Sequence, residues 1–358
     1  MLWIAGYISP IEGYAQAGLN YLMALKTAGF SDIDFLQLDQ PFNWNQAPKW
    51  SWPLRENGSK DRGTAIIHRV PNFIRQSRKG GTCFTGMTVF ETDRLPYWMT
   101  QELEEVTEAL IVPAKFNEAG LRMGGYTKPI HVVPHTVGDW WWKTSVPEER
   151  DRPFTFMYSG TWTVRKNVPG LLRAYRDAFP KPSPDIQLLL KTSYTLGAAD
   201  MYFEEFGPRE DILFWEDTWQ EKQMLWLFAN TDCFVSAHHS EGWGLGPFQA
   251  KLMGKPVIYT NWSAVTEFCS KTNGDIPVDY TMTCANKAFT GLPIYDEPNG
   301  NLLWATPTHE ALVEAFREMA KNADEYRRRA QAAAASLRDR YSWATVGQEL
   351  LSVIRALP

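Results

Sequence analysis

Residues 238–247 of this chain read HHSEGWGLGP, a stretch with three glycines around one carboxylate. They follow a short apolar run at Cys233–Ser236, which predicts a buried strand, and they open a predicted helix over residues 247–253. A further apolar run at residues 256–259 predicts the next strand. A strand, a helix and a strand in this order predict a β-α-β unit, and hence a parallel sheet.

The glycine-rich loop between that strand and that helix is a candidate ligand-binding loop. Gly242, Gly244 and Gly246 let the backbone approach a ligand closely, and the start of the following helix offers free N–H groups that favour phosphate. Glu241 can accept hydrogen bonds from sugar hydroxyls. The alternative is a glycine-rich turn with a surface glutamate, and for the loop taken alone both interpretations stand.

Short apolar runs alternate with amphipathic ones along the rest of the chain. The predicted strands are 2–5, 33–38, 65–68, 83–90, 109–112, 131–133, 154–158, 186–191 and 212–214, and the predicted helices include 168–179 and 220–228. Thr306-Pro307 predicts a helix start, because proline suits the first helical position. Residues 43–63 lack a pattern and predict a long loop of the kind that is usually functional or disordered.

A polar, charged stretch at residues 143–153 separates two similar halves. The fold class that fits is α/β, with two doubly wound, Rossmann-like domains facing a cleft and ligands at the carboxyl ends of the strands. The boundaries we predict are 1–142 for an acceptor-binding domain and 154–340 for a donor-binding domain. A C-terminal helix at 341–358 could cross back to the first domain.

The composition excludes several classes of protein. A chain of 358 residues with 44% hydrophobic and 22% charged residues is globular, and its net charge of −5 argues against a protein that coats nucleic acid. The four cysteines lie far apart, which favours reduced thiols in a cytoplasmic protein over a disulfide or zinc framework. No stretch approaches the ~18 apolar residues of a membrane span, and the N-terminus reads as a first strand.

Around the loop, several stretches resemble the retaining glycosyltransferases of family 4, whose members share the two-domain GT-B fold. The resemblance covers roughly residues 80–350 and is densest between Tyr158 and Phe268. Its donor-side motifs are SEGWGL at 240–245, AKLMGKPVI at 250–258, TNWS at 260–263 with Glu267-Phe268, and Ser159-Gly160 with Arg165-Lys166-Asn167. Its first-half motifs are FETDRLP at 90–96 and VPAKFN at 112–117.

The resemblance implies a nucleoside-diphosphate sugar as co-substrate, retention of the anomeric configuration, and no cofactor or metal. In the family a first glutamate contacts sugar hydroxyls and a second, eight positions later, holds the ribose; here these positions are Glu241 and Gln249. The charge on the diphosphate would be met mainly by Lys166, because many members carry arginine where this chain has Thr161. The donor-binding residues implied are Gly160, Thr161, Arg165, Lys166, Lys191, Glu241, Gly242, Trp243, Gly244, Leu245 and Gln249.

The acceptor side is less specific. Glu91 and Asp93 follow a predicted strand and could face the acceptor hydroxyl, so they join Glu241 and Lys166 as catalytic candidates; the alternative is that they cap a turn. The acceptor-binding candidates are Glu12, Gly13, Tyr14, His68, Arg75, Arg78 and Lys79. Residues 49–79 hold eight basic and two acidic residues with interleaved tryptophans, which suits a polyanion or is merely a solvated basic face.

Three functions remain open from the sequence. The first is a metal-independent glycosyltransferase acting on a glycan, a lipid-linked saccharide or a hydroxymethylated base in DNA. The second is a sugar-nucleotide-binding module that has lost catalysis, for which Gln249 is the motivating departure. The third is a phosphorylase of the same fold, which would need a lysine-bound pyridoxal group.

Overall fold

The computed structural model describes residues 1–5, 13–30, 32–38, 62–79, 81–144, 152–192, 197–285 and 301–357. The chain divides into two compact units. Unit 1 comprises Met1–Asp139, Ala285–Leu303 and Asp339–Pro358, and unit 2 comprises Trp140–Cys284 and Trp304–Arg338. The second domain, predicted as continuous from 154 to 340, therefore differs from unit 2. One reason is Asp93, whose backbone N–H donates to Leu303 O at 2.8 Å; its carboxylate accepts from Leu303 N–H at 2.7 Å.

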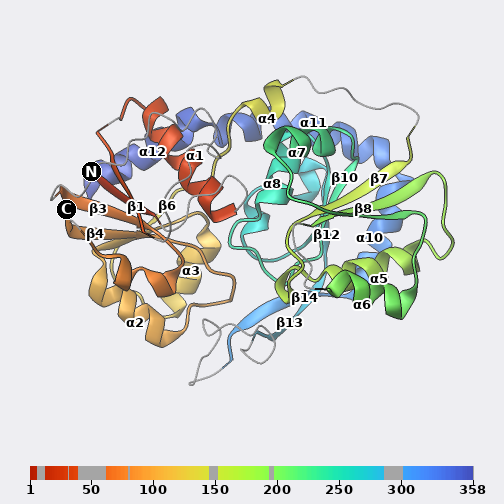
Figure 1. Ribbon diagram of the computed structural model, residues 1–358, viewed down its shortest axis with the longest axis horizontal. Helices are drawn as coiled ribbons and strands as arrows, with labels where there is room; N and C mark the ends of the chain where they lie inside the picture. The colour runs from red at the N-terminus through yellow and green to blue at the C-terminus, as the bar shows by residue number, and fades with distance from the viewer. Residues whose placement is uncertain are drawn as a thin grey trace. The chain divides into compact units, whose positions relative to one another are not determined.

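Unit 1 is built on a parallel six-stranded sheet in the order β2-β1-β3-β4-β5-β6. Because successive side chains on a strand point to opposite faces, both faces of this sheet are apolar and both are covered by helices. Leu2 and Ile4 pack under α2 and α3, whereas Trp3 and Ala5 pack under α1 and α12 (Figure 1). The bounds are β1 Leu2–Ala5, β2 Asp34–Gln37, β3 Arg62–His68, β4 Gly81–Met87, β5 Ala109–Val112, β6 Ile130–Val132, α1 Gly13–Thr27, α2 Tyr97–Val106, α3 Lys115–Met123 and α12 Trp343–Ala356.

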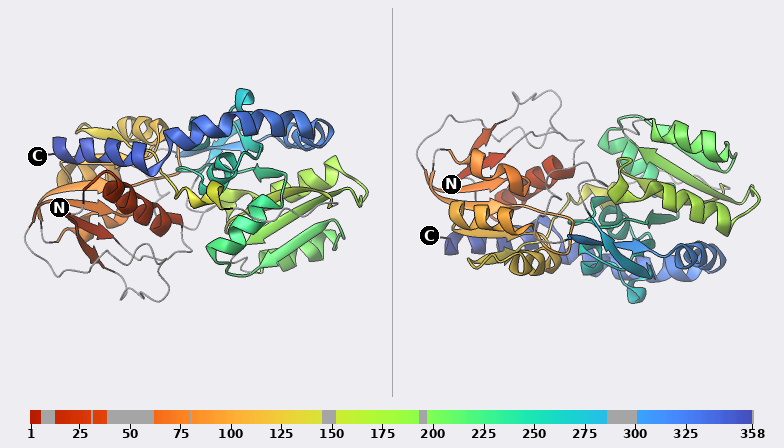
Figure 2. Two further views of the ribbon diagram at one scale, coloured as in Figure 1. Left: turned by 90° about the horizontal axis from the view of Figure 1, so that it is seen from above. Right: turned by 90° about the horizontal axis from the view of Figure 1, so that it is seen from below.

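The last helix of the chain packs on the first, and both views that show them place α12 beside α1 (Figures 1 and 2). Val346, Leu350 and Leu351 of α12 share a core cluster with Leu22 and Leu25 of α1. The close approach depends on Gly347, since a Cβ there would lie 2.1 Å from Ala24 O. The C-terminal segment thus completes the core of unit 1.

Unit 2 repeats the architecture with a parallel six-stranded sheet in the order β12-β11-β10-β7-β8-β9. Helices α5 and α10 cover one face, where Tyr175 and Phe316 pack on Phe156 of β7. A separate two-stranded sheet pairs β13 with β14. The bounds are α4 Trp140–Lys143, β7 Phe154–Ser159, α5 Val168–Ala178, β8 Ile186–Thr192, α6 Ala198–Phe206, β9 Ile212–Glu216, α7 Glu221–Ala229, β10 Cys233–Ser236, α8 Leu245–Leu252, β11 Val257–Thr260, β12 Ile276–Val278, β13 Tyr280–Cys284, β14 Leu303–Pro307, α10 His309–Lys321 and α11 Ala323–Arg340.

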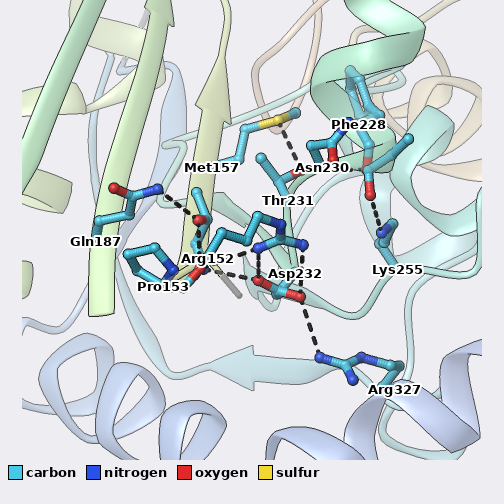
Figure 3. Close-up of polar contacts among 12 residues, drawn as sticks. Arg152, Pro153, Met157, Gln187, Phe228, Asn230, Thr231, Asp232, Lys255 and Arg327 are labelled. Atoms are coloured by element: carbon cyan, nitrogen blue, oxygen red, sulfur yellow. Dashed lines mark hydrogen bonds and ion pairs between the residues drawn. The ribbon is translucent and has the colours of Figure 1, made fainter. Parts of the chain in front are cut away.

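Asp232, just before β10, ties the beginning of two strands to a distant helix (Figure 3). Its carboxylate accepts hydrogen bonds from Arg152 at the entry to β7, from the backbone N–H of Thr155 at 2.9 Å, and from Arg327 of α11 at 3.2 Å. Burial raises the pKa of Asp232, but the hydrogen bonds from Arg152 and Thr155 outweigh this and hold the pKa below its ordinary value. The Asp232 carboxylate thus links the amino-terminal ends of β7 and β10. These ends lie opposite the carboxyl ends of the strands, where the site described below forms.

One expectation from the sequence, the helix start at Thr306-Pro307, is wrong. Pro307 is the last residue of β14, and the helix that follows starts only at His309, with Thr308 before it. Lys251 of α8 is fully buried with Asp275, and its Nζ lies 2.7 Å from the carboxylate. Lys251 also donates to Asn273 O at 2.7 Å. Its burial is therefore stabilised by two acceptors, Asn273 and Asp275, that lie more than twenty residues later in the chain.

Candidate functional site

The site in unit 2 forms where two neighbouring parallel strands end. β7 and β10 pair in parallel, with Phe156 opposite Cys233, so their carboxyl ends lie at the same edge of the sheet. β7 leads through Gly160 into a short 3-10 turn at Val164–Lys166, and β10 leads into the glycine-rich loop. Carboxyl ends of parallel strands are where ligands bind in open α/β sheets.

Three charged side chains meet at this edge. Glu241 Oε2 accepts a hydrogen bond from Arg165 Nη1 at 3.0 Å, and Glu241 Oε1 forms an ion pair with Lys166 Nζ. The carboxylate side chain is 6% exposed, and those of Arg165 and Lys166 are 23% and 19% exposed. We call this group the ion triad; it places two cations around one buried carboxylate at a partly accessible edge.

The backbone holds the two halves of the ion triad together. Arg165 Nη1 also donates to Ser240 O at 2.8 Å, and His239 N–H donates to Arg165 O at 2.7 Å. Asn167 follows Lys166 and donates from Nδ2 to Ala237 O at 3.1 Å. The turn after β7 and the loop after β10 are therefore joined on both sides of the charges.

The cations control the protonation of Glu241. Burial raises the pKa of this carboxyl, but the charges of Lys166 and Arg165 outweigh burial and lower the pKa to about 2. Beside it, burial lowers the pKa of His238 to about 4. At neutral pH Glu241 is thus ionised and His238 is neutral.

Backbone strain is concentrated at the same place. Among the described residues, only Asn167 (φ 51°) and Ser263 (φ 67°) are non-glycine residues with positive φ. Asn167 is next to Lys166, and Ser263 Oγ accepts the backbone N–H of Glu241 at 3.0 Å. Asparagine tolerates the left-handed region, whereas Ser263, with ψ −164°, adopts a conformation that is essentially confined to glycine and costs on the order of 1–3 kcal/mol.

Helix α8 starts directly after the loop, and glycines allow its approach. Gly244 has φ +91°, and a Cβ on Gly246 would lie 2.6 Å from Phe234 of β10. Trp243, a predicted donor-binding residue, is 3% exposed and packs on Phe248 and Phe268. Gln249 is buried on α8 at 7% exposure, Gly242 is also buried, and Leu245 is the half-buried first residue of the helix.

The remaining predicted donor residues lie at the ends of β7 and β8. Gly160 N–H donates to Lys191 O at 3.1 Å, and a Cβ on Gly160 would lie 2.7 Å from the Tyr158 hydroxyl. Thr161 is exposed. Lys191 is 4% exposed, and its ammonium group bonds to Thr192 O and Asp217 O. Burial lowers the pKa of Lys191, and its ammonium group is engaged with the loop after β9.

In unit 1, the predicted histidine, His68, is a core residue. His68 ends β3, is 3% exposed, stacks on Tyr14 with ring centroids 4.5 Å apart, and lies against Gly18. Burial lowers the pKa of His68 to about 3. Gly13 begins α1, and Glu12 lies outside the described residues. His68 is placed for packing, and little of it is accessible to an acceptor.

The other acceptor candidates mostly have local partners. Arg75 forms ion pairs with Glu102 and Glu105, and Arg78 lies over the Phe84 ring at 4.6 Å. Lys79 is exposed. Asp93 is engaged with Leu303, as described above, and with Arg94 at 3.1 Å, whereas Glu91 is half-buried. The part of the basic run at 49–79 that precedes Arg62 lies outside the described residues.

Sequence reasoning singled out Arg165, Lys166 and Glu241, and the structure brings them together. It did not single out His238, or the backbone roles of Asn167 and Ser263. An asparagine directly after two cations is a usable signal for a left-handed turn. Nothing in the sequence signals the positive φ of Ser263, since serine rarely adopts it.

The described residues contain no group of three or more His, Cys, Asp or Glu side chains placed to hold a metal ion. No helix among them is long and apolar enough to cross a membrane.

Comparison with known proteins identifies the fold. No family model matches the chain. Sucrose-phosphate synthase from Thermosynechococcus elongatus superimposes with a TM-score of 0.72 at 13% identity, covering 99% of this chain and 98% of the other. HepE from Anabaena, in complex with UDP and glucose, superimposes with a TM-score of 0.69 at 12% identity over 100% of both chains. The protein has the GT-B fold, which confirms the predicted fold class.

A curated relative adds a partial match in sequence. O-antigen chain mannosyltransferase B from Escherichia coli is 29% identical over 113 residues. The match spans 31% of this chain and 29% of the mannosyltransferase, so it covers less than a third of either. The relative and the structural neighbours are glycosyltransferases.

Proposed function

We propose that this protein is a glycosyltransferase that moves a sugar from a nucleoside diphosphate sugar to a hydroxyl acceptor. The observation that carries the proposal is the ion triad at the carboxyl edge of β7 and β10. The ion triad places two cations at the edge where α8 starts, and cations and the start of a helix both favour a diphosphate. A GT-B neighbour that was solved with UDP and glucose supports this class of donor.

The chemistry follows from where charge develops. The bond between the anomeric carbon and the phosphate oxygen breaks, and both of its electrons leave with the diphosphate. Arg165 and Lys166 are already in place to stabilise that growing negative charge without solvent rearrangement. The acceptor oxygen then bonds to the anomeric carbon on the same face, so the configuration is retained, and its proton passes to the departing phosphate oxygen. We propose that no metal ion is needed for this step.

The roles within unit 2 follow the resemblance and the geometry together. Glu241 would orient the sugar through its hydroxyls while its charge keeps the two cations in position. Gln249 would bond the ribose, and the backbone around Gly160 and Gly244 would approach the phosphates. We propose that Lys191 shapes the site through Asp217, because its ammonium group is already bonded there.

The acceptor is a glycan, a lipid-linked saccharide or a hydroxymethylated base in DNA. The ion pairs of Arg75 with Glu102 and Glu105 compensate part of the positive charge that motivates the DNA acceptor. Glu91 and Asp93 stay the unit 1 carboxylates proposed to face the acceptor hydroxyl, and the carboxylate of Asp93 is also bonded to Leu303 and Arg94.

Thermal unfolding with a panel of UDP-, GDP-, ADP- and TDP-sugars tests the proposal. A ligand that binds the folded chain alone raises the unfolding temperature by mass action, so one family of donors should raise it. The Lys166→Ala variant should show a smaller rise with the same donor. No rise with any donor at millimolar concentration would contradict the proposal.

A further inference from the structure

Ser263 stands out because it holds a backbone conformation for which its side chain is unsuited. It lies in the loop that follows β11, the strand next to β10, with Ser236 opposite Tyr259. Its φ of 67° and ψ of −164° suit glycine, and the residue is 4% exposed. Strain of this kind persists where the surroundings impose it, and it is often found at functional sites.

The surroundings of Ser263 point to one neighbour, Glu241. Ser263 Oγ accepts the backbone N–H of Glu241 at 3.0 Å, and the following residue, Ala264, donates its N–H to Glu241 O at 3.2 Å. The loop after β11 therefore forms hydrogen bonds with both the backbone N–H and the backbone C=O of Glu241. On the other side, Thr266 holds Ser263 by donating from Oγ1 to Ser263 O at 2.8 Å.

His238 supports the same arrangement from the start of the glycine-rich loop. Its Nε2 lies 3.4 Å from Ser263 Oγ, and its Nδ1 lies 2.9 Å from Ser236 Oγ. Ser263 Oγ is thus placed between the backbone of Glu241 and the ring of His238. A glycine would satisfy the backbone conformation but would leave the N–H of Glu241 without this acceptor.

We propose that Ser263 is a positioning residue, whose hydroxyl fixes the backbone of Glu241 so that the carboxylate meets Arg165 and Lys166. The proposal rests on the proposed function for its effect on sugar transfer. A hydroxyl at this position requires a residue with a Cβ, and the backbone conformation there favours glycine. The strain at Ser263 is the consequence.

Two substitutions separate strain from positioning. Ser263→Ala removes the hydroxyl and keeps the strain, whereas Ser263→Gly removes both. Each should lower kcat for sugar transfer by roughly tenfold, because each removes one well-placed hydrogen bond. The KM for the donor should change little. The unfolding temperature should fall in Ser263→Ala and should stay level or rise in Ser263→Gly.

Ser270 offers a matched control in unit 2, because its Oγ also accepts a backbone N–H, from Asn273 at 3.3 Å. Ser270→Ala should lower the unfolding temperature and leave kcat at the wild-type value. Wild-type kcat in Ser263→Gly would overturn the proposal, as would an unfolding temperature that falls as far in Ser263→Gly as in Ser263→Ala.

Crystal structures of the unliganded wild type and Ser263→Gly give a test that needs no activity. The proposal predicts that the Glu241 carboxylate moves away from Arg165 and Lys166 in the variant, and an unmoved carboxylate would overturn it. If the wild type transferred no sugar from any donor, the proposed function would fail, and this structural comparison would still decide the role of Ser263.

Discussion

Glu241 is a buried carboxylate that two cations bind before any substrate arrives. A diphosphate that reaches Arg165 and Lys166 must share them with this internal counter-ion. The ion triad therefore sets a balance: the carboxylate keeps the cations in place, and it also competes with the ligand for them. Substitution of Glu241 should therefore weaken the positioning of the cations and strengthen their binding to the diphosphate.

The first prediction concerns acid stability. The folded-state pKa of Glu241, about 2, lies below its ordinary value of 4.5, so the ionised group stabilises the fold above about pH 4.5 and this contribution is lost as the pH falls toward 2. A shift of this size corresponds to roughly 3 kcal/mol. In urea unfolding, Glu241→Gln should be less stable than the wild type at pH 7, and the gap should narrow on acidification. Glu325→Gln, at an exposed pair, is the control; a gap that stays constant with pH would contradict the account.

The same Glu241→Gln variant should bind the bare nucleoside diphosphate at least as tightly as the wild type, because the cations lose their internal partner. Transfer should fall, since the sugar loses a carboxylate that orients it. Calorimetric titration measures the first effect. Abolished nucleotide binding would show that Glu241 does not have the proposed role.

Lys166→Ala should act on the chemical step. Removing a preplaced group that stabilises developing charge lowers kcat by about 10²–10³-fold. Lys321→Ala, at an exposed position at the end of α10, removes a charge outside the site and serves as the control. Unchanged kcat in Lys166→Ala, with the control also unchanged, would place the diphosphate elsewhere.

At the scale of elements, the start of α8 depends on glycine. Gly244 has φ +91°, and a Cβ there would lie 2.9 Å from Val265 Cγ2, in the same loop as Ser263. Gly29 has a similar φ of +84°, but nothing lies within 4 Å of its Cβ position, so it isolates the backbone effect. Both alanine variants should lose stability on the order of 1 kcal/mol from the positive φ.

Only Gly244→Ala should also weaken binding of the donor, because it moves the helix start relative to the ion triad. The rise in unfolding temperature on adding the nucleotide measures this. An equal rise in Gly244→Ala and Gly29→Ala would show that the helix start does not contribute to the donor site.

The elements that could be predicted from the sequence are those buried on both faces. β1, β5 and β10 have the predicted bounds, because each is an uninterrupted apolar run in a parallel sheet. Helix α11 was not predicted, since its buried residues are only Ala330 and Ala334 and give no apolar stripe. The partners of Lys251 and the strain at Ser263 depend on tertiary contacts, which no local pattern encodes.

The whole molecule is assembled from segments distant in the chain, and unit 1 is closed by the C-terminal helix. Gly347→Ala would place a Cβ 2.1 Å from Ala24 O, so α12 could not keep its distance from α1. We expect a loss of about 1–3 kcal/mol in urea unfolding, the usual effect of overpacking. Ser352→Ala, on the exposed side of α12, is the control and should unfold like the wild type.

Release of nucleoside diphosphate from sugar nucleotides, measured in EDTA with and without hydroxyl acceptors, shows whether the protein transfers sugar without a metal ion. We expect release by the wild type from at least one donor without added metal, and release lowered by about 10²–10³-fold in Lys166→Ala. Release that disappears in EDTA and returns with Mg²⁺ or Mn²⁺ would contradict the metal-free step. No release from any donor, although the nucleotide still binds, would contradict the transferase itself and would leave a binding module.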